Sequence, residues 1–227
     1  MSKQVILTGG ASGIGRALSE ELCRRGAHVL IVDRQIALAE EVVADIRARG
    51  GSAEAVELDV REAAALGACV KDFAARRGRL DYIFNNAGIG VSGESKDFDA
   101  EDWSEVIDIN LCGVINGVRA AYPIMIAQGE GHIVNTASMS GLLPAPFTVS
   151  YAASKHALVG LSRSLRAEAK QYGVRVSVLC PGVIDTPMLR GGRFGRVKYE
   201  VDWDRMTEEF KRMRPLDPAV YARRSLD

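Results

Sequence analysis

The strongest constraint on the fold is a regular alternation of short apolar runs with longer stretches of helical periodicity. Six runs rich in Val and Ile have the length of buried strands: residues 4–8, 28–32, 53–58, 80–84, 132–136 and 174–179. Five stretches with helical spacing accompany them: residues 14–25, 37–49, 62–77, 101–128 and 150–172. Strands that alternate with helices form right-handed crossovers. The sequence therefore predicts an α/β fold in which residues 1–227 form one doubly wound parallel sheet with helices on both faces.

Charge and composition exclude several classes of protein. The 29 basic and 29 acidic residues balance, whereas nucleic-acid binders usually carry a basic excess. No apolar run approaches the roughly 20 residues that an integral membrane segment needs, and a strand begins too early for a signal peptide. The three His residues form no ligand cluster, so no metal site is expected. Cysteines far apart in the chain are typical of reduced core residues in a cytoplasmic protein: Cys23, Cys69, Cys112 and Cys180.

Two segments depart from the simplest pattern. Apolar side chains surround most of the predicted helix 101–128, although one stripe suffices to cover a sheet. Its outer side is then buried either against another subunit, in a homodimer or homotetramer, or within the monomer. Near the other end, a helical stretch at 218–226 is followed by no further strand. We therefore expect a chain that is short at its C-terminus.

A glycine-rich turn follows the first predicted strand. Gly9, Gly13 and Gly15 stand in the pattern Gly-x-x-x-Gly-x-Gly, with Ser12 and Ile14 between them, and a helix comes next. Glycines let backbone N–H groups approach a pyrophosphate, and the helix N-terminus faces the anion with its partial positive charge. A simple tight turn is the alternative, but the position between strand and helix favours dinucleotide binding.

The end of the second predicted strand bears on the choice of dinucleotide. Asp33 can accept hydrogen bonds from the adenosine ribose hydroxyls, and it would repel the 2′-phosphate of NADP. Arg34, the next residue, could instead pair with that phosphate. We expect NAD as the cofactor, with NADP as the alternative.

Tyr151 and Lys155 are candidate catalytic residues. Side chains four residues apart lie on one face of a helix, so the phenol and the ammonium can point into the same pocket. A cation about 4 Å away at an effective dielectric near 20 contributes about 4 kcal/mol, or roughly three pKa units. That would bring the phenol close to neutrality, where general acid–base catalysis works best. Ser138 follows the fifth predicted strand, the run 85–88 closes the fourth, and Asn110 lies in the predicted helix 101–128; all are candidates for the same site.

With these motifs in this order, the chain resembles the short-chain dehydrogenase/reductases of the short, non-extended type, from Thr8 to about Thr186. The resemblance implies a Rossmann fold and an NAD(P)-dependent alcohol dehydrogenase or carbonyl reductase. It assigns catalysis to Asn110, Ser138, Tyr151 and Lys155. It assigns cofactor binding to Gly9, Ser12, Gly13, Ile14, Gly15, Asp33, Arg34, Asp59, Val60, Asn86, Ala87, Gly88, Tyr151, Lys155, Pro181, Gly182, Ile184 and Thr186.

The resemblance also implies a mechanism. Tyr151 exchanges a proton with the substrate oxygen while hydride moves to or from the nicotinamide. Lys155 lowers the phenol pKa and bonds the nicotinamide ribose, Ser138 stabilises the substrate oxygen, and Asn110 connects Lys155 to solvent through water. A cofactor-sensing protein without turnover, or an inactive partner subunit of the same fold, are the alternatives.

The substrate is expected to be a lipophilic secondary alcohol or ketone. Apolar side chains follow Ser138 and open the predicted substrate lid at about 187–214: Leu142, Leu143, Phe147, Met188 and Leu189. The lid also holds Arg190, Arg193, Arg196 and Lys198. These cations either face solvent or meet an anionic substrate group or a membrane surface.

Overall fold

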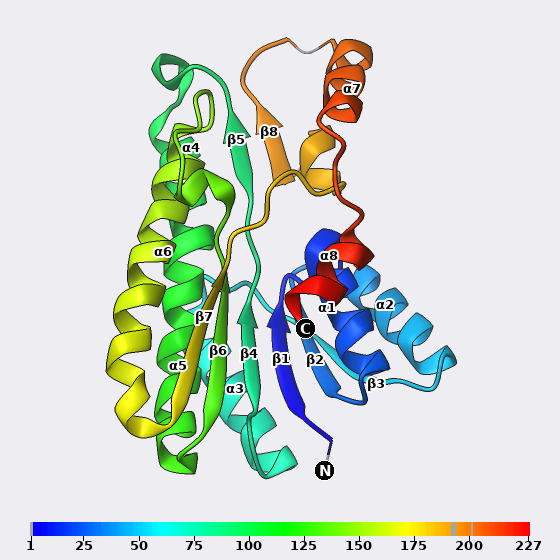
Figure 1. Cartoon of the computed structure of the whole chain (residues 1–227), viewed down its shortest axis with the longest axis vertical. Helices are drawn as coiled ribbons and strands as arrows, with labels where there is room; N and C mark the ends of the chain where they lie inside the picture. The colour runs from blue at the N-terminus through cyan, green and yellow to red at the C-terminus, as the bar shows by residue number, and fades with distance from the viewer. Residues whose placement is uncertain (1, 192–193, 201) are drawn as a thin grey trace.

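The computed structural model of the chain describes residues 2–191, 194–200 and 202–227. Its centre is a six-stranded parallel sheet in the order β3-β2-β1-β4-β6-β7 (Figure 1). The strands are β1 (Gln4–Thr8), β2 (His28–Asp33), β3 (Ser52–Glu57), β4 (Tyr82–Asn85), β6 (Gly131–Thr136) and β7 (Val174–Leu179). The α/β fold with a doubly wound parallel sheet is therefore confirmed, and the predicted strands match to within two residues at their ends.

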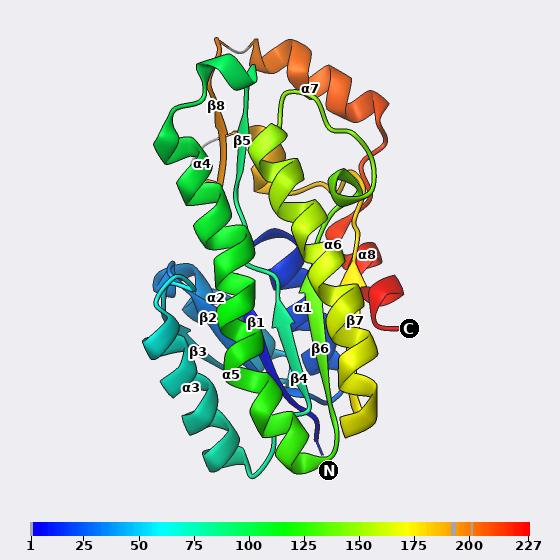
Figure 2. The ribbon, with the colours of Figure 1, turned by 90° about the vertical axis from the view of Figure 1, so that its left-hand side faces the viewer.

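Helices cover both faces of this sheet (Figures 1 and 2). One layer contains α1 (Gly13–Arg24), α2 (Ile36–Ala48) and α8 (Pro218–Ser225), and the other contains α3 (Ala63–Arg77), α5 (Gly113–Gln128) and α6 (Val149–Ala169). Strand β1 shows why two layers form. Val5 and Leu7 pack in the core cluster with α1 and α2, while Ile6 packs in the cluster with α3 and α5, because successive side chains of a strand point to opposite faces.

The long helical segment predicted at 101–128 is interrupted. It consists of α4 (Ala100–Ile107), a π-helical turn (Asp108–Cys112) and α5. Asp99 and Asp102 form a capping box at its start, in which each side chain accepts a hydrogen bond from the backbone N–H of the other. The π turn widens the helix where Asn110 lies, and periodicity alone did not reveal it.

By length and composition the span Ala100–Gln128 would also suffice to cross a membrane. In this fold it lies against the sheet, and Ala121 and Met125 of α5 are fully buried in the core. The segment is thus a core helix, as expected from the absence of a longer apolar run.

A second, smaller sheet was not predicted. Strand β5 (Gly90–Ser92) pairs in parallel with β8 (Gly195–Val197) beyond the carboxyl ends of the main strands. A 3₁₀ turn (Pro187–Arg190) precedes β8, and α7 (Trp203–Arg212) follows it. These elements fall within the predicted lid, so part of the lid is a regular strand.

Candidate active site

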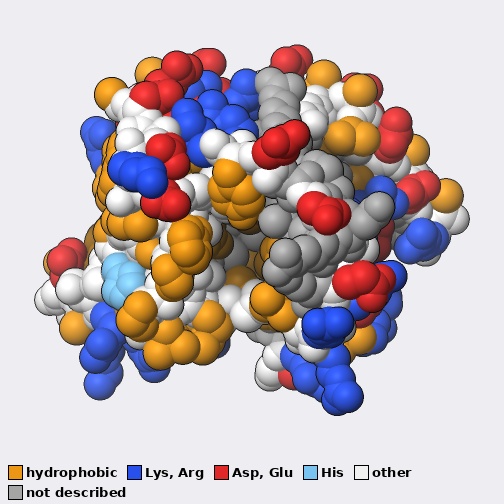
Figure 3. All heavy atoms as spheres, turned by 90° about the horizontal axis from the view of Figure 1, so that it is seen from above, with side chains coloured by type: hydrophobic (Ala, Val, Ile, Leu, Met, Phe, Trp, Pro, Cys, Tyr) orange, Lys and Arg blue, Asp and Glu red, His pale blue; other side chains and the backbone are white. Residues whose placement is uncertain are grey.

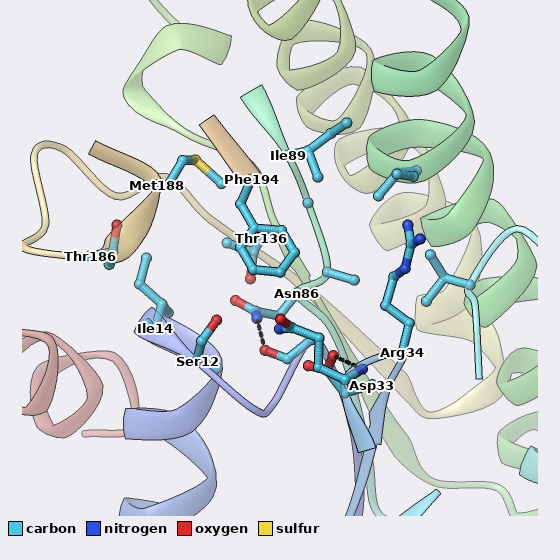
Figure 4. A pocket seen from close by; sticks show the side chains of 18 of the residues that line it. Ser12, Ile14, Asp33, Arg34, Asn86, Ile89, Thr136, Thr186, Met188 and Phe194 are labelled. Carbon is cyan, nitrogen blue, oxygen red and sulfur yellow. Dashed lines mark hydrogen bonds between the residues drawn. The ribbon is translucent and has the colours of Figure 1, made fainter. Parts of the chain in front are cut away.

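A cavity opens at the carboxyl edge of the sheet, where β1, β4 and β6 end. Its lining runs from the glycine turn and the end of β2 to Tyr151 and Lys155 on α6; Figure 4 shows Ser12, Asp33 and Phe194 among the lining side chains. Open α/β sheets bind ligands at this edge, at the point where the strand order reverses. In this sheet that point lies between β1 and β4.

Backbone conformation or close contact requires glycine at three positions at the start of the cavity. Gly9 has φ +68°, and a Cβ there would lie 2.8 Å from the Cα of Ala87 on the neighbouring segment. Gly13 has φ +51°, in the left-handed region that favours glycine. A Cβ at Gly15 would overlap the carbonyl oxygen of Gly9. Backbone conformation and close contacts therefore require glycine at these positions of the turn, which leads into the N-terminus of α1.

Asp33 occupies the far end of the cavity and braces the glycine turn. Its carboxylate accepts hydrogen bonds from the backbone N–H groups of Ala11 at 3.0 Å and Gln35 at 2.9 Å. Arg34 lines the same end (Figure 4). Its guanidinium lies 3.8 Å from Asp59, whose carboxylate is held more closely by Arg61 at 2.6 Å. The hydrogen bonds from Arg61 keep the pKa of Asp59 below its usual value.

Tyr151 and Lys155 face the cavity from the first turns of α6. The ammonium of Lys155 donates a 2.9 Å hydrogen bond to the carbonyl oxygen of Thr136 and lies 5.4 Å from the centre of the Tyr151 ring. Lys155 is only 3 % exposed, and burial lowers its pKa to about 8. At neutral pH the side chain therefore remains mostly protonated.

The expected lowering of the phenol pKa by Lys155 is not what this pocket shows. Burial raises the pKa of Tyr151, and the hydrogen bond with Ser138 opposes that rise. The physical reason is that desolvation disfavours the phenolate, while Lys155 sits beside the ring and is bonded to Thr136. In this pocket the neutral phenol, a proton donor, is the favoured form.

Ser138 and Asn110 stand behind the cavity surface. Ser138 is 8 % exposed, accepts a hydrogen bond from the backbone N–H of Ser140 at 3.1 Å, and bonds Tyr151. Asn110 is fully buried in the π turn. Its side chain accepts from the N–H of Ile89 at 2.8 Å and donates to the Ile89 carbonyl at 2.9 Å. A third bond, to Ser154 at 3.2 Å, ties it to α6.

Most residues proposed from the sequence meet at this cavity. Those in the lining are Gly9, Ser12, Gly13, Ile14, Gly15, Asp33, Arg34, Asp59, Val60, Asn86, Ala87, Gly88, Tyr151, Lys155, Pro181, Thr186 and Met188. Those outside it are Asn110, Ser138, Leu142, Leu143, Phe147, Gly182, Ile184 and Leu189. Leu142, Leu143 and Phe147 are more than half exposed, so their part in substrate binding stays a prediction.

Several lining residues were missed by sequence reasoning. They include Gln35, Leu58, Ile89, Glu105, Ile109, Thr136 and Phe194. Thr136 is notable because its hydroxyl is buried without a hydrogen-bond partner. It stands at the carboxyl end of β6, two residues before Ser138, and that position was the available signal.

The cations of the lid meet carboxylates of the protein. Arg190 pairs with Asp185 at 2.6 Å, and Arg196 and Lys198 pair with acidic side chains of α4 and its cap. Arg193 lies outside the described residues. Arg190 is 71 % exposed although it is paired, and binding of an anionic substrate group or a membrane surface by the lid stays a prediction.

The site fits a nicotinamide dinucleotide. Gly9, Gly13 and Gly15 of the glycine turn line the cavity beside the N-terminus of α1, and the Ser12 hydroxyl makes no capping bond to that helix. Asp33 stands at one end, Lys155 and the unpartnered hydroxyl of Thr136 at the other. These residues would hold the cofactor through its phosphates, its adenosine ribose and its nicotinamide half respectively.

Comparison with known families decides the assignment. Residues 3–193 match the model of the short chain dehydrogenase family. The chain belongs to that family. As a short-chain dehydrogenase it has an NAD(P)-binding Rossmann fold, and the resemblance inferred from its motifs is confirmed.

Two curated relatives are similar in sequence to about four fifths of the chain. The dehydrogenase is 42 % identical over 183 residues to the "Probable oxidoreductase EphD" of Mycobacterium tuberculosis, covering 80 % of this chain and 31 % of EphD. It is 37 % identical over 187 residues to the Oxidoreductase UcpA of Escherichia coli, covering 82 % of this chain and 71 % of UcpA. The chain thus spans about a third of the length of EphD.

Solved structures of similar proteins contain either cofactor. A short-chain dehydrogenase from Burkholderia phymatum in complex with NAD superposes with a TM-score of 0.85 at 32 % identity, over 97 % of this chain and 83 % of that one. A putative gluconate 5-dehydrogenase from Beutenbergia cavernae with bound NADP gives 0.85 at 34 % identity, over 97 % and 86 %. The family comparison therefore supports NAD(P) without choosing between the two.

Proposed function

We propose that this short-chain dehydrogenase is an oxidoreductase that uses NAD to interconvert a lipophilic secondary alcohol and its ketone. One observation carries the proposal. A single cavity joins the glycine turn to Tyr151 and Lys155, and its wall near Tyr151 is formed by Ile89, Met188 and Phe194. An apolar wall beside the acid–base group favours a substrate with hydrocarbon next to its oxygen.

The chain's own residues handle the proton. When bound, the nicotinamide supplies the hydride donor or acceptor. Tyr151 gives its hydroxyl proton to a carbonyl oxygen in reduction, and in oxidation its deprotonated phenolate takes the proton from the alcohol; Ser138 bonds the phenol oxygen in place. Lys155 donates one N–H to the carbonyl of Thr136, and its two other N–H groups can donate to ribose hydroxyls. Asn110 fixes the backbone of Ile89 and, in this proposal, connects Lys155 to solvent through water.

The preference for NAD rests on Asp33. Its carboxylate is 8 % exposed and ends β2 at the edge of the cavity, where a 2′-phosphate would meet like charge. Thermal unfolding tests it: a cofactor at 100 times its dissociation constant stabilises by about 2.7 kcal/mol, a shift of roughly 5–10 °C for a chain of this size. A shift with NADP and none with NAD would mean that Arg34 outweighs Asp33.

Turnover is tested with alcohols of graded polarity. Initial rates of NAD reduction should be highest with lipophilic secondary alcohols and low with polyols or sugars. Tyr151→Phe should abolish turnover and still show the NAD-dependent thermal shift. Activity confined to polyols would refute the substrate class, and a wild type that binds NAD but turns over none of these substrates would favour the non-catalytic sensor or inactive subunit.

We also propose a homodimer or homotetramer in the cytoplasm. Several apolar side chains of α5 are only partly buried within one chain, among them Ile115, Val118 and Ile126. Contact with α5 or α6 of a second copy would cover them. Sedimentation at micromolar concentration should show the oligomer, and a monomer would refute it.

A further inference from the structure

Strand β8 lies over the catalytic end of the cavity and touches the main body at two places. Its backbone pairs with β5 in the register Gly195 to Gly90 and Val197 to Ser92. The N–H of Lys198 donates a further 2.9 Å bond to the carbonyl of Ser92. Two short strands alone are marginal in water, so side-chain contacts must help to hold β8 in position.

Those side-chain contacts are ionic and converge on one buried carboxylate. Arg196 lies 3.0 Å from one oxygen of Asp102 and 2.9 Å from Glu105. Lys198 lies 2.7 Å from the other oxygen of Asp102 and 3.2 Å from Asp99. The side chain of Asp102 is only 3 % exposed. A buried carboxylate depends on its partners, because removing one cation leaves charge that water cannot reach.

The same segment carries Phe194. Phe194 directly precedes β8, and Arg196 and Lys198 reach the carboxylates of α4 and its cap. Phe194 lines the cavity (Figure 4) and packs against the cluster formed by Val60, Ile89, Val91, Val106 and Ile109. Tyr151 packs against that cluster too.

Helix α4 therefore supports both ends of this segment. Its first turns supply the carboxylates that hold Arg196 and Lys198, and its last residues adjoin the apolar cluster on which Phe194 rests. Glu105 links the ion pairs to the cavity, because it pairs with Arg196 and also lines the cavity. Figure 3 views the molecule from above, onto the end that carries α4 and β8. On this face basic and acidic side chains lie side by side, and hydrophobic side chains gather near a hollow.

We infer that Arg196, through its ion pair with the buried Asp102, is a positioning residue that holds Phe194 in the wall of the substrate pocket and so sets substrate selectivity. We call the ion pairs of Arg196 with Asp102 and Glu105 the clamp. The effect on substrate selectivity rests on the proposed function, whereas the clamp itself belongs to the fold. Loss of the pair should free β8 from α4 and widen the pocket beside Tyr151. Binding of bulky apolar substrates would weaken, while the proton-transfer residues stay as they are.

The test compares Arg196→Met with Arg190→Met. Both variants replace a lid arginine by an uncharged side chain of similar length, but Arg190 pairs with Asp185, and the two side chains are 71 % and 48 % exposed. Arg196→Met should raise KM for a lipophilic alcohol about tenfold or more and change kcat less than threefold. Arg196→Lys, which keeps the charge, should recover part of the loss. Arg190→Met should match the wild type.

A second readout does not depend on activity. Backbone hydrogen exchange in residues 194–199, measured without cofactor, should be faster in Arg196→Met and unchanged in Arg190→Met. Asp102→Asn keeps an acceptor for the Asp99 N–H. The double variant Asp102→Asn, Arg196→Met should speed exchange in residues 194–199 by less than the combined effects of the two single changes predict.

The outcomes separate the two proposals. Faster exchange in Arg196→Met with no turnover of any alcohol by the wild type would support the clamp and refute the proposed function. Normal exchange and an unchanged KM in Arg196→Met would refute the clamp, whatever the substrate. A rise in KM equal in both arginine variants would also refute it, because the effect would then follow lid charge in general.

Discussion

Replacing Asn110 by Leu should lower the stability of the fold even without cofactor. Leu has a similar volume but removes three hydrogen bonds, two of them to the backbone of Ile89. Asn110 is fully buried and Ile89 is 7 % exposed, so water cannot replace the lost partners. Each buried group left unsatisfied costs about 1–3 kcal/mol. Two such groups give a loss of about 3 kcal/mol or more in the free energy of unfolding.

That loss is measurable by heat and by denaturant. For a chain of this size each kcal/mol shifts the melting temperature by about 2–4 °C, so we expect a fall of roughly 6–12 °C. The matched control is Asn116→Leu, on α5, whose amide makes one 3.0 Å bond to the carbonyl of Val60 in a partly buried setting. Its expected loss is about 1 kcal/mol.

The result also separates two roles for Asn110. If the residue served only to relay protons, Asn110→Leu would be inactive but as stable as the wild type. A fall in melting temperature below about 2 °C, or no larger than that of Asn116→Leu, would refute the structural argument. The structural argument would be supported if the melting temperature of Asn110→Leu fell by the expected amount and NAD still raised that melting temperature.

Three further predictions use other parts of the fold. Gly15→Ala should abolish the NAD-dependent thermal shift, because its Cβ overlaps the carbonyl of Gly9, whereas Gly67→Ala, in open space on α3, should stabilise by about 0.5–1 kcal/mol; equal behaviour would contradict this. Burial lowers the pKa of His132 from 6.5 to about 4. The unfolded chain thus binds a proton more readily, and stability is lost as pH falls from 6.5 towards 4. Urea unfolding measures this: over that pH range the free energy of unfolding of His132→Gln should fall by about 2 kcal/mol less than that of the wild type, after allowance for solvent screening. Identical pH profiles of the two proteins would contradict the prediction. Asp33→Asn should shift the ratio of NAD to NADP dissociation constants about tenfold towards NADP by removing one charge; an unchanged ratio in fluorescence titration would show that Asp33 does not face the 2′ position.

The sequence predicted the main sheet well because its central strands are buried on both faces. Strand β2 is buried at every residue, so its composition is almost wholly apolar and stands out from its surroundings. The small sheet gave no such signal. Strand β5 has three residues, and its partner β8 lies about a hundred residues later, so neither length nor periodicity marks either strand.

The site was predictable where the chain geometry requires particular residues. Gly9, Gly13 and Gly15 are fixed by backbone conformation or close contact, and Tyr151 and Lys155 by helical spacing. Phe194 was missed because only the folded arrangement brings it to the cavity. Helical spacing did not reveal that Lys155 bonds the carbonyl of Thr136 or that burial raises the pKa of the Tyr151 phenol.

The π turn at Asp108–Cys112 determines where the long helix can change in length. An α-helix turns about 100° per residue, so a deletion within α5 would rotate the residues on one side of it and turn Ala121 and Met125 away from the sheet. A π turn holds one extra residue without changing the phase of its flanks. Loss of Cys112 would therefore leave the downstream helix seated and disturb mainly Asn110. In this helix, the core should therefore tolerate a one-residue deletion best at the turn that supports the active site.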